Sequence, residues 1–249
     1  MRHKKSCDGW RVFMGGCVVE VDRNSVCISI VVPVLNERAA LPHLIERLLL
    51  LQDQGCEVLL ADGGSDDGSV SLIQAAGLQV VPSARGRARQ MNSGAMQAQG
   101  DVLLFLHADT ELPADAIACV LGALRSGAHQ WGRFDVRIRG HHWMLRVVAT
   151  LMNLRSRLTG VATGDQALFV CRHAFNAVGG FADQPLMEDI AMSKQLLRLS
   201  RPACIARRVT TSGRRWETRG VWRTIVLMWR LRWLYWRGVA PEILARYYR

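Results

Sequence analysis

The chain has 249 residues, a net charge of +11 and a hydrophobic content of 49%. That length fits one large α/β domain or a domain with an appendage, and no window offers the roughly twenty uncharged apolar residues of a membrane-spanning helix. Seven scattered cysteines without a C-x-x-C pair argue against a zinc site and favour a reducing compartment, so we expect a cytoplasmic protein.

Residues 1–25 are predicted to form a loosely ordered leader. The first residues, Met1–Lys5, are basic, and the apolar stretch Val12–Val19 is interrupted by glycines before it runs into a charged segment. A signal peptide needs an uninterrupted apolar centre, so this leader does not resemble one.

Strands and helices alternate through the next hundred residues. Short apolar runs predict strands at Ile28–Leu35, Glu57–Ala61, Leu78–Val81 and Asp101–Leu106. Apolar residues at helical spacing predict a helix from Leu41 to its stop at Gly55, and further helices at Val70–Ala76, Arg87–Gln99 and Ala114–Ser126. This alternation predicts a parallel α/β sheet wound right-handedly.

The second half of the chain is less regular. Its pattern predicts an edge strand at Arg133–Arg139, helices at Trp143–Leu158, Arg172–Val178 and Asp189–Leu199, and strands at Ala167–Cys171 and Ile205–Val209. No linker divides the chain, so we expect one domain over residues 26–220, followed by an amphipathic helical segment over residues 221–249.

Two predicted strands end in polar segments. The apolar run that begins at Val102 stops at His107 and Asp109. The predicted strand Glu57–Ala61 is followed in the same way by Asp62. Ligands of an open parallel sheet bind at the carboxyl ends of its strands, so these side chains indicate a metal–phosphate site. The alternative is helix capping, which explains Asp66 and Asp67 well and the His-Ala-Asp segment poorly.

The motifs resemble, in order and spacing, those of the family 2 glycosyltransferases, which have the GT-A fold. The matching segments are ISIVVPVLNE (28–37), LLADGGSDDGS (59–69), ARQMNSGAMQAQGDVLLFLHADT (88–110), TGDQALF (163–169), MEDIAMS (187–193) and SGRRWE (212–217). The chain is most similar to small bacterial single-domain members that carry HAD in place of D-x-D. The resemblance implies a Rossmann-like, mostly parallel sheet flanked by helices, and inverting transfer from a nucleotide sugar.

The resemblance also assigns donor-site residues. It implies that Pro33, Asn36 and Glu37 line the nucleoside pocket, that Asp62 meets the base, and that Asp109 binds Mg²⁺ or Mn²⁺ beside the diphosphate. A UDP-sugar is the expected donor. His107 replaces the first acid of D-x-D; it either joins Asp109 on the metal, which Mn²⁺ tolerates, or hydrogen-bonds a neighbouring loop. Glu37 could instead face a helix N-terminus.

Arginines are expected around the same diphosphate. Arg89 opens a helix in a segment that relatives place near the donor, and the alternative for it is a solvated basic turn. In the SGRRWE segment, Arg214 or Arg215 could neutralise the leaving diphosphate, with Trp216 packed beside it. The segment lacks the Gln of the Q-x-x-R-W motif of processive relatives, which argues against a polymerase.

The catalytic base is expected in the E-D pair. By resemblance Asp189 deprotonates the acceptor, and Glu188 orients it or binds it; alternatively both acids face a helix dipole. Gly164, Asp165 and Gln166 resemble the acceptor-side loop, although Thr-Gly-Asp is also good turn chemistry. The acceptor oxygen belongs to a hydroxyl or a carboxyl group, and its identity is open.

The last 49 residues hold twelve arginines against two glutamates. Within them, Val221–Arg237 is rich in tryptophan, with Arg223, Arg230 and Arg237 forming one helical stripe. Such a helix either contacts an anionic membrane peripherally, at the inner face of the cell membrane, or packs over the sheet. A lipid-linked acceptor would fit the first arrangement.

Two other functions compete with this interpretation. A nucleotidyltransferase of similar α/β architecture should carry a glycine-rich phosphate loop after its first strand, where this chain has VLNER. A protein that binds membranes or nucleic acid would act through the basic tail, whose tryptophans could stack on bases. Nucleic acid is not an expected partner of the glycosyltransferase.

Overall fold

The computed structural model describes residues 10–14, 17–21 and 26–248. Strands β1 (Trp10–Met14) and β2 (Cys17–Val21) pair antiparallel and form a two-stranded sheet of their own. The other residues of the predicted leader, 1–9, 15–16 and 22–25, lie outside the described residues.

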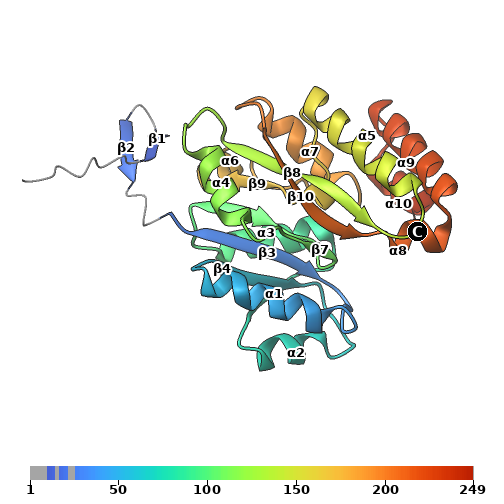
Figure 1. Cartoon of the computed structure of the whole chain (residues 1–249), viewed down its shortest axis with the longest axis horizontal. Coiled ribbons are helices and arrows are strands. Elements are labelled where there is room, and N and C mark those ends of the chain that lie inside the picture. The colour runs from blue at the N-terminus through green and yellow to red at the C-terminus, as the bar shows by residue number, and fades with distance from the viewer. Residues whose placement is uncertain (1–9, 15–16, 22–25, 249) are drawn as a thin grey trace, which may run out of the picture.

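The main sheet has eight strands and forms the centre of the molecule (Figure 1). In spatial order they are β5 (Gln79–Pro82), β4 (Glu57–Asp62), β3 (Ile28–Val34), β6 (Val102–Phe105), β9 (Phe169–Cys171), β8 (Trp131–Arg139), β10 (Ala203–Ser212) and β7 (Thr110–Glu111). Strands β5, β4, β3 and β6 run parallel, as the sequence predicts. Strand β9 is antiparallel to both of its neighbours and β7 is antiparallel to β10, whereas the other six strands run in one direction, so the sheet is mixed but mostly parallel.

Strand β8 is not the edge strand that its alternation predicts. It lies between β9 and β10, and β10 runs parallel to it. Its first four residues, from Trp131 to Phe134, are all buried, and only the part from Asp135 onward alternates between buried and accessible side chains. The alternation therefore marks the half-covered end of an interior strand.

Helices cover both faces of the sheet. They are α1 (Leu41–Asp53), α2 (Ser69–Ala75), α3 (Arg87–Gln97), α4 (Ala116–Leu124), α5 (Met144–Thr159), α6 (Arg172–Ala177), α7 (Glu188–Leu196), α8 (Arg214–Arg219), α9 (Val221–Trp236) and α10 (Pro241–Tyr248), with a short 3₁₀ helix η1 at Gly164–Gln166. The sequence pattern predicts α1 to α7 and α9 to within a few residues, α10 lies within the helical segment expected over residues 221–249, and α8 is missed. The α/β fold class is confirmed.

Alternate residues of β3 enter two different hydrophobic cores. Ile30 belongs to the core beneath α1, α4 and α5, whereas Val31 belongs to the core beneath α3, α6 and α7. Helix α3 lies close to the sheet because Gly94 has no side chain; a Cβ atom there would collide with Val31. This close contact fixes the N-terminus of α3 above the carboxyl ends of β3 and β4.

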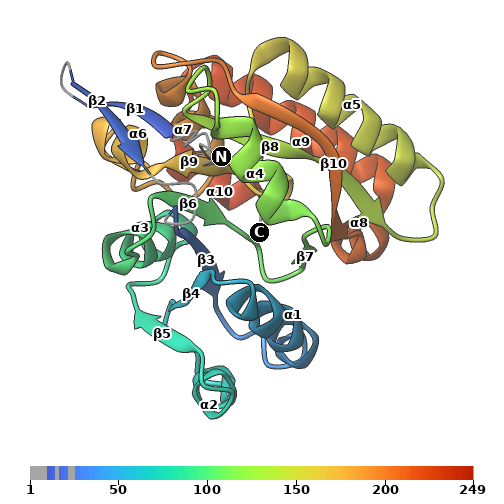
Figure 2. The same ribbon diagram turned by 60° about the vertical axis from the view of Figure 1, so that its left-hand side comes forward.

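The C-terminal helices pack on the domain through a third, smaller core. Met187 and Ile190 at the start of α7 join Leu231 of α9 and Leu244 of α10. Both views show α9 running beside α5 (Figure 2). None of the helices in residues 26–248 is long and apolar enough to cross a membrane.

Candidate active site

A polar cavity of about 500 Å³ lies at the carboxyl ends of β3 and β6. Its walls contain four residues that the sequence assigns to the donor site, Pro33, Glu37, His107 and Asp109, and Arg87 from the N-terminus of α3. The neighbouring strands β3 and β6 are parallel, so the chain leaves both strands at the same edge of the sheet. The cavity therefore forms where the topology of an open α/β sheet places a ligand.

Asn36 and Asp62 shape the loop beside this cavity. The Asp62 carboxylate accepts hydrogen bonds from the N–H groups of Gly64 and Ser65 and from the Ser65 hydroxyl. Asn36 has a left-handed backbone, with φ at 54°, and its Oδ1 accepts the N–H of Asp66 at 3.0 Å. Both side chains hold the 62–69 loop, and neither lines the cavity wall.

Helix capping accounts for the second of the paired acids in this loop. Asp67 Oδ1 accepts the N–H of Ser69, the first residue of α2, at 2.9 Å, and its Oδ2 accepts the N–H of Arg38. The Ser69 hydroxyl bonds to the same Asp67 oxygen. These hydrogen bonds connect the start of α2 to the segment that follows β3, and they lower the pKa of Asp67.

Glu37 is half-buried at the cavity wall. Burial raises the pKa of Glu37, the Arg214 guanidinium opposes this effect, and the Asp109 carboxylate adds to it. Asp109 lines the same cavity wall as Glu37, and Arg214 is near enough for its charge to act on Glu37. A nucleotide that brings hydroxyl donors and a metal would stabilise the ionised form of Glu37.

His107 contacts the acceptor-side loop. Its Nδ1 lies 3.4 Å from Asp165 Oδ1, and a Cβ atom on Gly164 would collide with the imidazole ring. Burial alone would raise the pKa of Asp165, but the hydrogen bond and charge of His107, helped by Arg87 and Arg232, hold that pKa below its usual value. The structure thus shows the loop contact that is the alternative to metal binding by His107.

Asp109 is the residue in this cavity that best fits a divalent metal. Its side chain is exposed to the cavity, and within residues 26–248 no cluster of three His, Cys, Asp or Glu side chains could form a closed metal site. Mg²⁺ in nucleotide-dependent enzymes commonly takes one or two protein carboxylates, with substrate phosphates and water as its other ligands. A single Asp109 carboxylate fits that ligand set.

The E-D pair opens α7 next to the loop that contains Asp165. Asp189 Oδ2 accepts the N–H of Gly164 at 2.9 Å, and Oδ1 accepts the N–H of Ile190 at 2.7 Å. A carboxylate has about four acceptor positions, so each oxygen can accept one more proton or hydrogen bond. Met187, which precedes the pair, has a left-handed backbone with φ at 66° and directs both acids inward.

Glu188 is buried and has a different electrostatic environment from Asp189. Burial and the Asp189 charge raise the pKa of Glu188, and Arg87, whose Nη1 lies 4.0 Å from Glu188 Oε1, partly opposes them. The same acids, with Asp165, outweigh desolvation and raise the pKa of Arg87. Arg87 therefore links the polar cavity to the predicted base.

Helix α3 supplies positioning residues that the sequence analysis did not single out. Gln90 Nε2 donates to the carbonyls of Val34 and Ala61 at 2.7 and 2.8 Å, which joins the ends of β3 and β4. Asn92 bonds both the N–H and the carbonyl of Phe181 in the segment before α7. Both residues lie in the quoted ARQMNSGA motif, which is the signal that could have found them.

Several predicted site residues have other contacts. Arg89 turns away from the cavity and pairs with Asp183 at 2.8 Å. Arg215 stacks on the Tyr248 ring at 3.6 Å and donates to the Tyr248 carbonyl. Trp216 lines an apolar groove rather than the polar cavity. Of this set, Arg214 acts on the cavity acid Glu37 through its charge.

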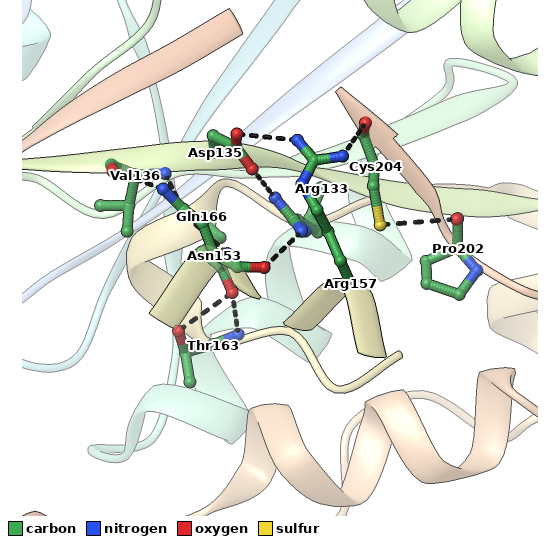
Figure 3. Close-up of polar contacts among 9 residues, drawn as sticks. All are labelled: Arg133, Asp135, Val136, Asn153, Arg157, Thr163, Gln166, Pro202 and Cys204. Carbon is green, nitrogen blue, oxygen red and sulfur yellow. Dashed lines mark hydrogen bonds and ion pairs between the residues drawn. The ribbon is translucent and has the colours of Figure 1, made fainter. Parts of the chain in front are cut away.

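Gln166 is fully buried and belongs to a polar network (Figure 3). Its Oε1 accepts the N–H of Thr163 at 3.2 Å, and its Nε2 donates to Asn153 Oδ1 at 3.4 Å. Asn153 in turn bonds both backbone groups of Val136, and its carbonyl accepts from Arg133. Gln166 therefore holds η1 against β8 and α5, and its neighbours Gly164 and Asp165 are the residues of this loop that face the site.

Comparison with known proteins decides between the candidate functions. Residues 29–176 match the family model for glycosyl transferase family 2. The chain belongs to this family. It is an enzyme of the glycosyltransferase class, and membership excludes the nucleotidyltransferase alternative.

Its relatives include proteins that act on a lipid acceptor. The chain is 32% identical over 150 residues to an undecaprenyl-phosphate 4-deoxy-4-formamido-L-arabinose transferase of Aeromonas hydrophila, covering 55% of this chain and 46% of the relative. It is 33% identical over 157 residues to the protein of the same name from Pseudomonas fluorescens, covering 56% of this chain and 44% of the relative. The chain thus spans less than half the length of these curated relatives.

Solved structures show the same fold. Glucosyl-3-phosphoglycerate synthase from Mycobacterium tuberculosis, in complex with Mn²⁺, UDP and glucosyl-3-phosphoglycerate, superposes with a TM-score of 0.56 at 20% identity. The match covers 76% of this chain and 71% of that one. The same synthase in complex with Mg²⁺ and UDP gives an equal TM-score. This likeness confirms the GT-A fold of the chain.

Proposed function

We propose that this glycosyltransferase is an inverting, metal-dependent enzyme that moves a sugar from a UDP-sugar to an acceptor oxygen. The observation that carries the proposal is the contact between His107 and Asp165. It joins the polar cavity, where Asp109 and Glu37 lie, to the loop whose Gly164 bonds to Asp189. Donor groups and a base thus meet at one point.

The donor would occupy the polar cavity. Asp109 would hold Mg²⁺ or Mn²⁺ with the diphosphate oxygens, and the bound metal would neutralise charge on the leaving nucleoside diphosphate. Glu37 would accept hydrogen bonds from the ribose hydroxyls. Arg87 and Arg214, whose charges act on the cavity acids, add to the positive field around the diphosphate.

The acceptor would react at the side that faces Asp189. Where the acceptor is a hydroxyl, Asp189 takes its proton as the oxygen bonds to the anomeric carbon, whereas an ionised phosphate or carboxylate oxygen attacks without losing a proton. In either case the bond from that carbon to the diphosphate breaks with its electron pair on the leaving group. Glu188, which lies 4.0 Å from Arg87 Nη1, orients Arg87 and the acceptor. Single displacement inverts the anomeric configuration.

We further propose a lipid-linked acceptor and a location at the cytoplasmic face of a membrane. Relatives named as undecaprenyl-phosphate transferases support a lipid acceptor. The tryptophan- and arginine-rich helix α9 has the composition of a helix that lies at an anionic interface.

Donor binding and turnover test this function. UDP-, GDP- and dTDP-sugars are titrated into the protein by calorimetry with and without Mn²⁺, and nucleoside diphosphate release is then measured for Asp109→Asn and Asp189→Asn. We expect binding of a UDP-sugar that requires metal, loss of that binding in Asp109→Asn, and turnover reduced about a hundredfold or more in Asp189→Asn with donor binding kept. Asp183→Asn, an exposed acid outside the cavity, is the matched control. Wild-type turnover in both site variants would contradict the assignment.

A further inference from the structure

A second hollow, larger than the polar cavity, runs between α5 and α9. This groove has a volume of about 840 Å³, and nearly all of its walls are apolar. They are formed by Met144, Val148, Leu151, Met152, Leu154, Leu158, Trp216, Trp222, Ile225, Met228 and Trp229. A groove of this volume with apolar walls can hold a long apolar ligand such as an alkyl chain.

The inner end of the groove is charged. Arg155 of α5, Arg232 of α9 and Asp165 of η1 line it. The Nε and Nη2 atoms of Arg155 are buried and have no hydrogen-bond partner, and within residues 26–248 the side chain of Arg232 forms no hydrogen bond or ion pair, although the charges of Asp189 and Asp165 act on it. Burial, together with the charge of Arg232, lowers the pKa of Arg155 to about 10, so it stays charged at neutral pH. Buried charges usually form hydrogen bonds or ion pairs, and two adjacent guanidinium groups whose side chains form neither indicate an anionic ligand.

The two rims of the groove expose apolar side chains in regular rows. On α5 the row is Val147, Leu151, Leu154 and Leu158, and on α9 it is Trp222, Val226, Trp229, Trp233 and Trp236. The spacing of four and three residues places each row on one face of its helix. Tryptophan at this density is typical of helices that lie at the headgroup level of a bilayer.

The groove opens toward the transfer site. Asp165 lines the groove, His107 lines the polar cavity, and their side chains lie 3.4 Å apart. The Asp189 carboxylate attracts both Arg155 and Arg232, which places the charged end of the groove beside the proposed base. A ligand that fills the groove would therefore present its head to the donor.

We infer that the groove binds the acceptor as an amphiphile taken from a bilayer, with its apolar chain between α5 and α9 and its anionic head, a phosphate or carboxylate, on Arg155 and Arg232. The acceptor role rests on the proposed function. A second copy of the chain covering the groove would bury the apolar rims as well, but the face shared by α5 and α9 offers arginines, not acids, to these two guanidinium groups.

Two amphiphiles of equal chain length test the groove. Dodecyl phosphate and dodecyl maltoside are titrated into the full chain by calorimetry below their micelle concentrations. We expect dodecyl phosphate to bind at least about tenfold more tightly, and the double variant Arg155→Gln/Arg232→Gln to lose that preference while its maltoside affinity is unchanged. Arg223→Gln, which removes an exposed charge from the same helix, should behave as wild type. Trp229→Glu should weaken both amphiphiles by charging the groove wall.

Flotation with vesicles tests the bilayer as the source. The protein should float with phosphatidylcholine vesicles that contain dodecyl phosphate, and Trp229→Ser/Trp233→Ser should reduce the bound fraction. Absence of flotation with these vesicles would overturn the bilayer source.

Calorimetry with UDP and Mn²⁺ on the same samples separates the two proposals. Equal affinity for the two amphiphiles, or a double variant that keeps the preference for phosphate, would overturn the groove assignment in a protein that still binds UDP and Mn²⁺. Selective binding of dodecyl phosphate by a protein that does not bind UDP and Mn²⁺ would support the anion site and overturn the proposed function.

Discussion

His107 Nδ1 lies 3.4 Å from Asp165 Oδ1, so the residue that replaces an acid of D-x-D is held by the loop on the acceptor side. Gly164 permits this contact because the imidazole occupies the space that a Cβ atom would need. This contact joins the polar cavity to the loop that contains Asp165, and in our proposal Asp109 is the metal ligand of the motif.

The variant Gly164→Ala tests the contact between His107 and Asp165. The new methyl group would displace the buried imidazole from Asp165, so we expect the acceptor KM to rise about tenfold while the affinity for the nucleotide and metal stays near that of wild type. Steady-state kinetics and calorimetry measure the two quantities. Gly122→Ala is the matched control, because its Cβ meets nothing within 4 Å. Equal losses of donor and acceptor binding in Gly164→Ala would show instead that His107 serves the metal.

Gln90 ties two strand ends together at the floor of the cavity. In Gln90→Leu the carbonyls of Val34 and Ala61 lose their hydrogen bonds in a buried place, so we expect the free energy of unfolding to fall by about 2 kcal/mol. Urea denaturation measures this loss. Gln97→Leu, at an exposed position of the same helix, should change stability by less than about 0.5 kcal/mol. An unchanged midpoint in Gln90→Leu would contradict the structural role.

The sequence predicts the first half of the fold well because its strands are buried on both faces and its helices carry one apolar face. Ile28–Val34 illustrates this: six of its seven residues are buried, and the expected range differs by one residue. Strand β8 could not be placed in the same way. Its outer end alternates, and its interior position depends on β10, which begins more than sixty residues later.

Some site residues could likewise be predicted from the sequence, and others depend on tertiary contacts. Pro33 lies near the end of β3, and Glu37 and Asp109 follow the ends of β3 and β6, so topology alone brings them together. The sequence could not predict the contacts of Arg89 and Gln166, because the direction of each side chain depends on a tertiary partner. That partner is Asp183 for Arg89 and Asn153 for Gln166. The sequence could not predict the charged end of the groove either, because Arg155 and Arg232 come together only when α5 packs beside α9.

Cys56 should be inert in the native protein. Burial raises the pKa of its thiol to about 11, so the reactive thiolate is scarce at pH 8. We expect iodoacetamide to modify Cys56 at least about a hundredfold more slowly in the native state than in urea, as followed by peptide mass spectrometry. A Cys56→Ala protein identifies the peptide. Native labelling at the rate seen in urea would show that this end of α1 opens readily.

Glu188 gives the chain a stability that depends on pH. Its pKa is raised in the folded state, so the folded state holds this proton more tightly than the unfolded state does. The stabilisation by protonated Glu188 is therefore complete below the unfolded pKa, near 4.5, and is lost as the pH rises through the folded value. In Glu188→Gln that loss is absent, so the variant should gain stability over wild type as the pH rises above 4.5, until the difference becomes constant. Urea denaturation across this range measures the difference.

The control for Glu188 is Glu242→Gln, which removes an exposed acid from the first turn of α10. This variant makes the same chemical change at an exposed position, so it separates the effect of burying a carboxylate from the effect of removing one. A Glu188→Gln difference that does not change with pH would show that burial next to Asp189 does not raise the pKa of Glu188, and the electrostatic environment assigned to this acid would be wrong.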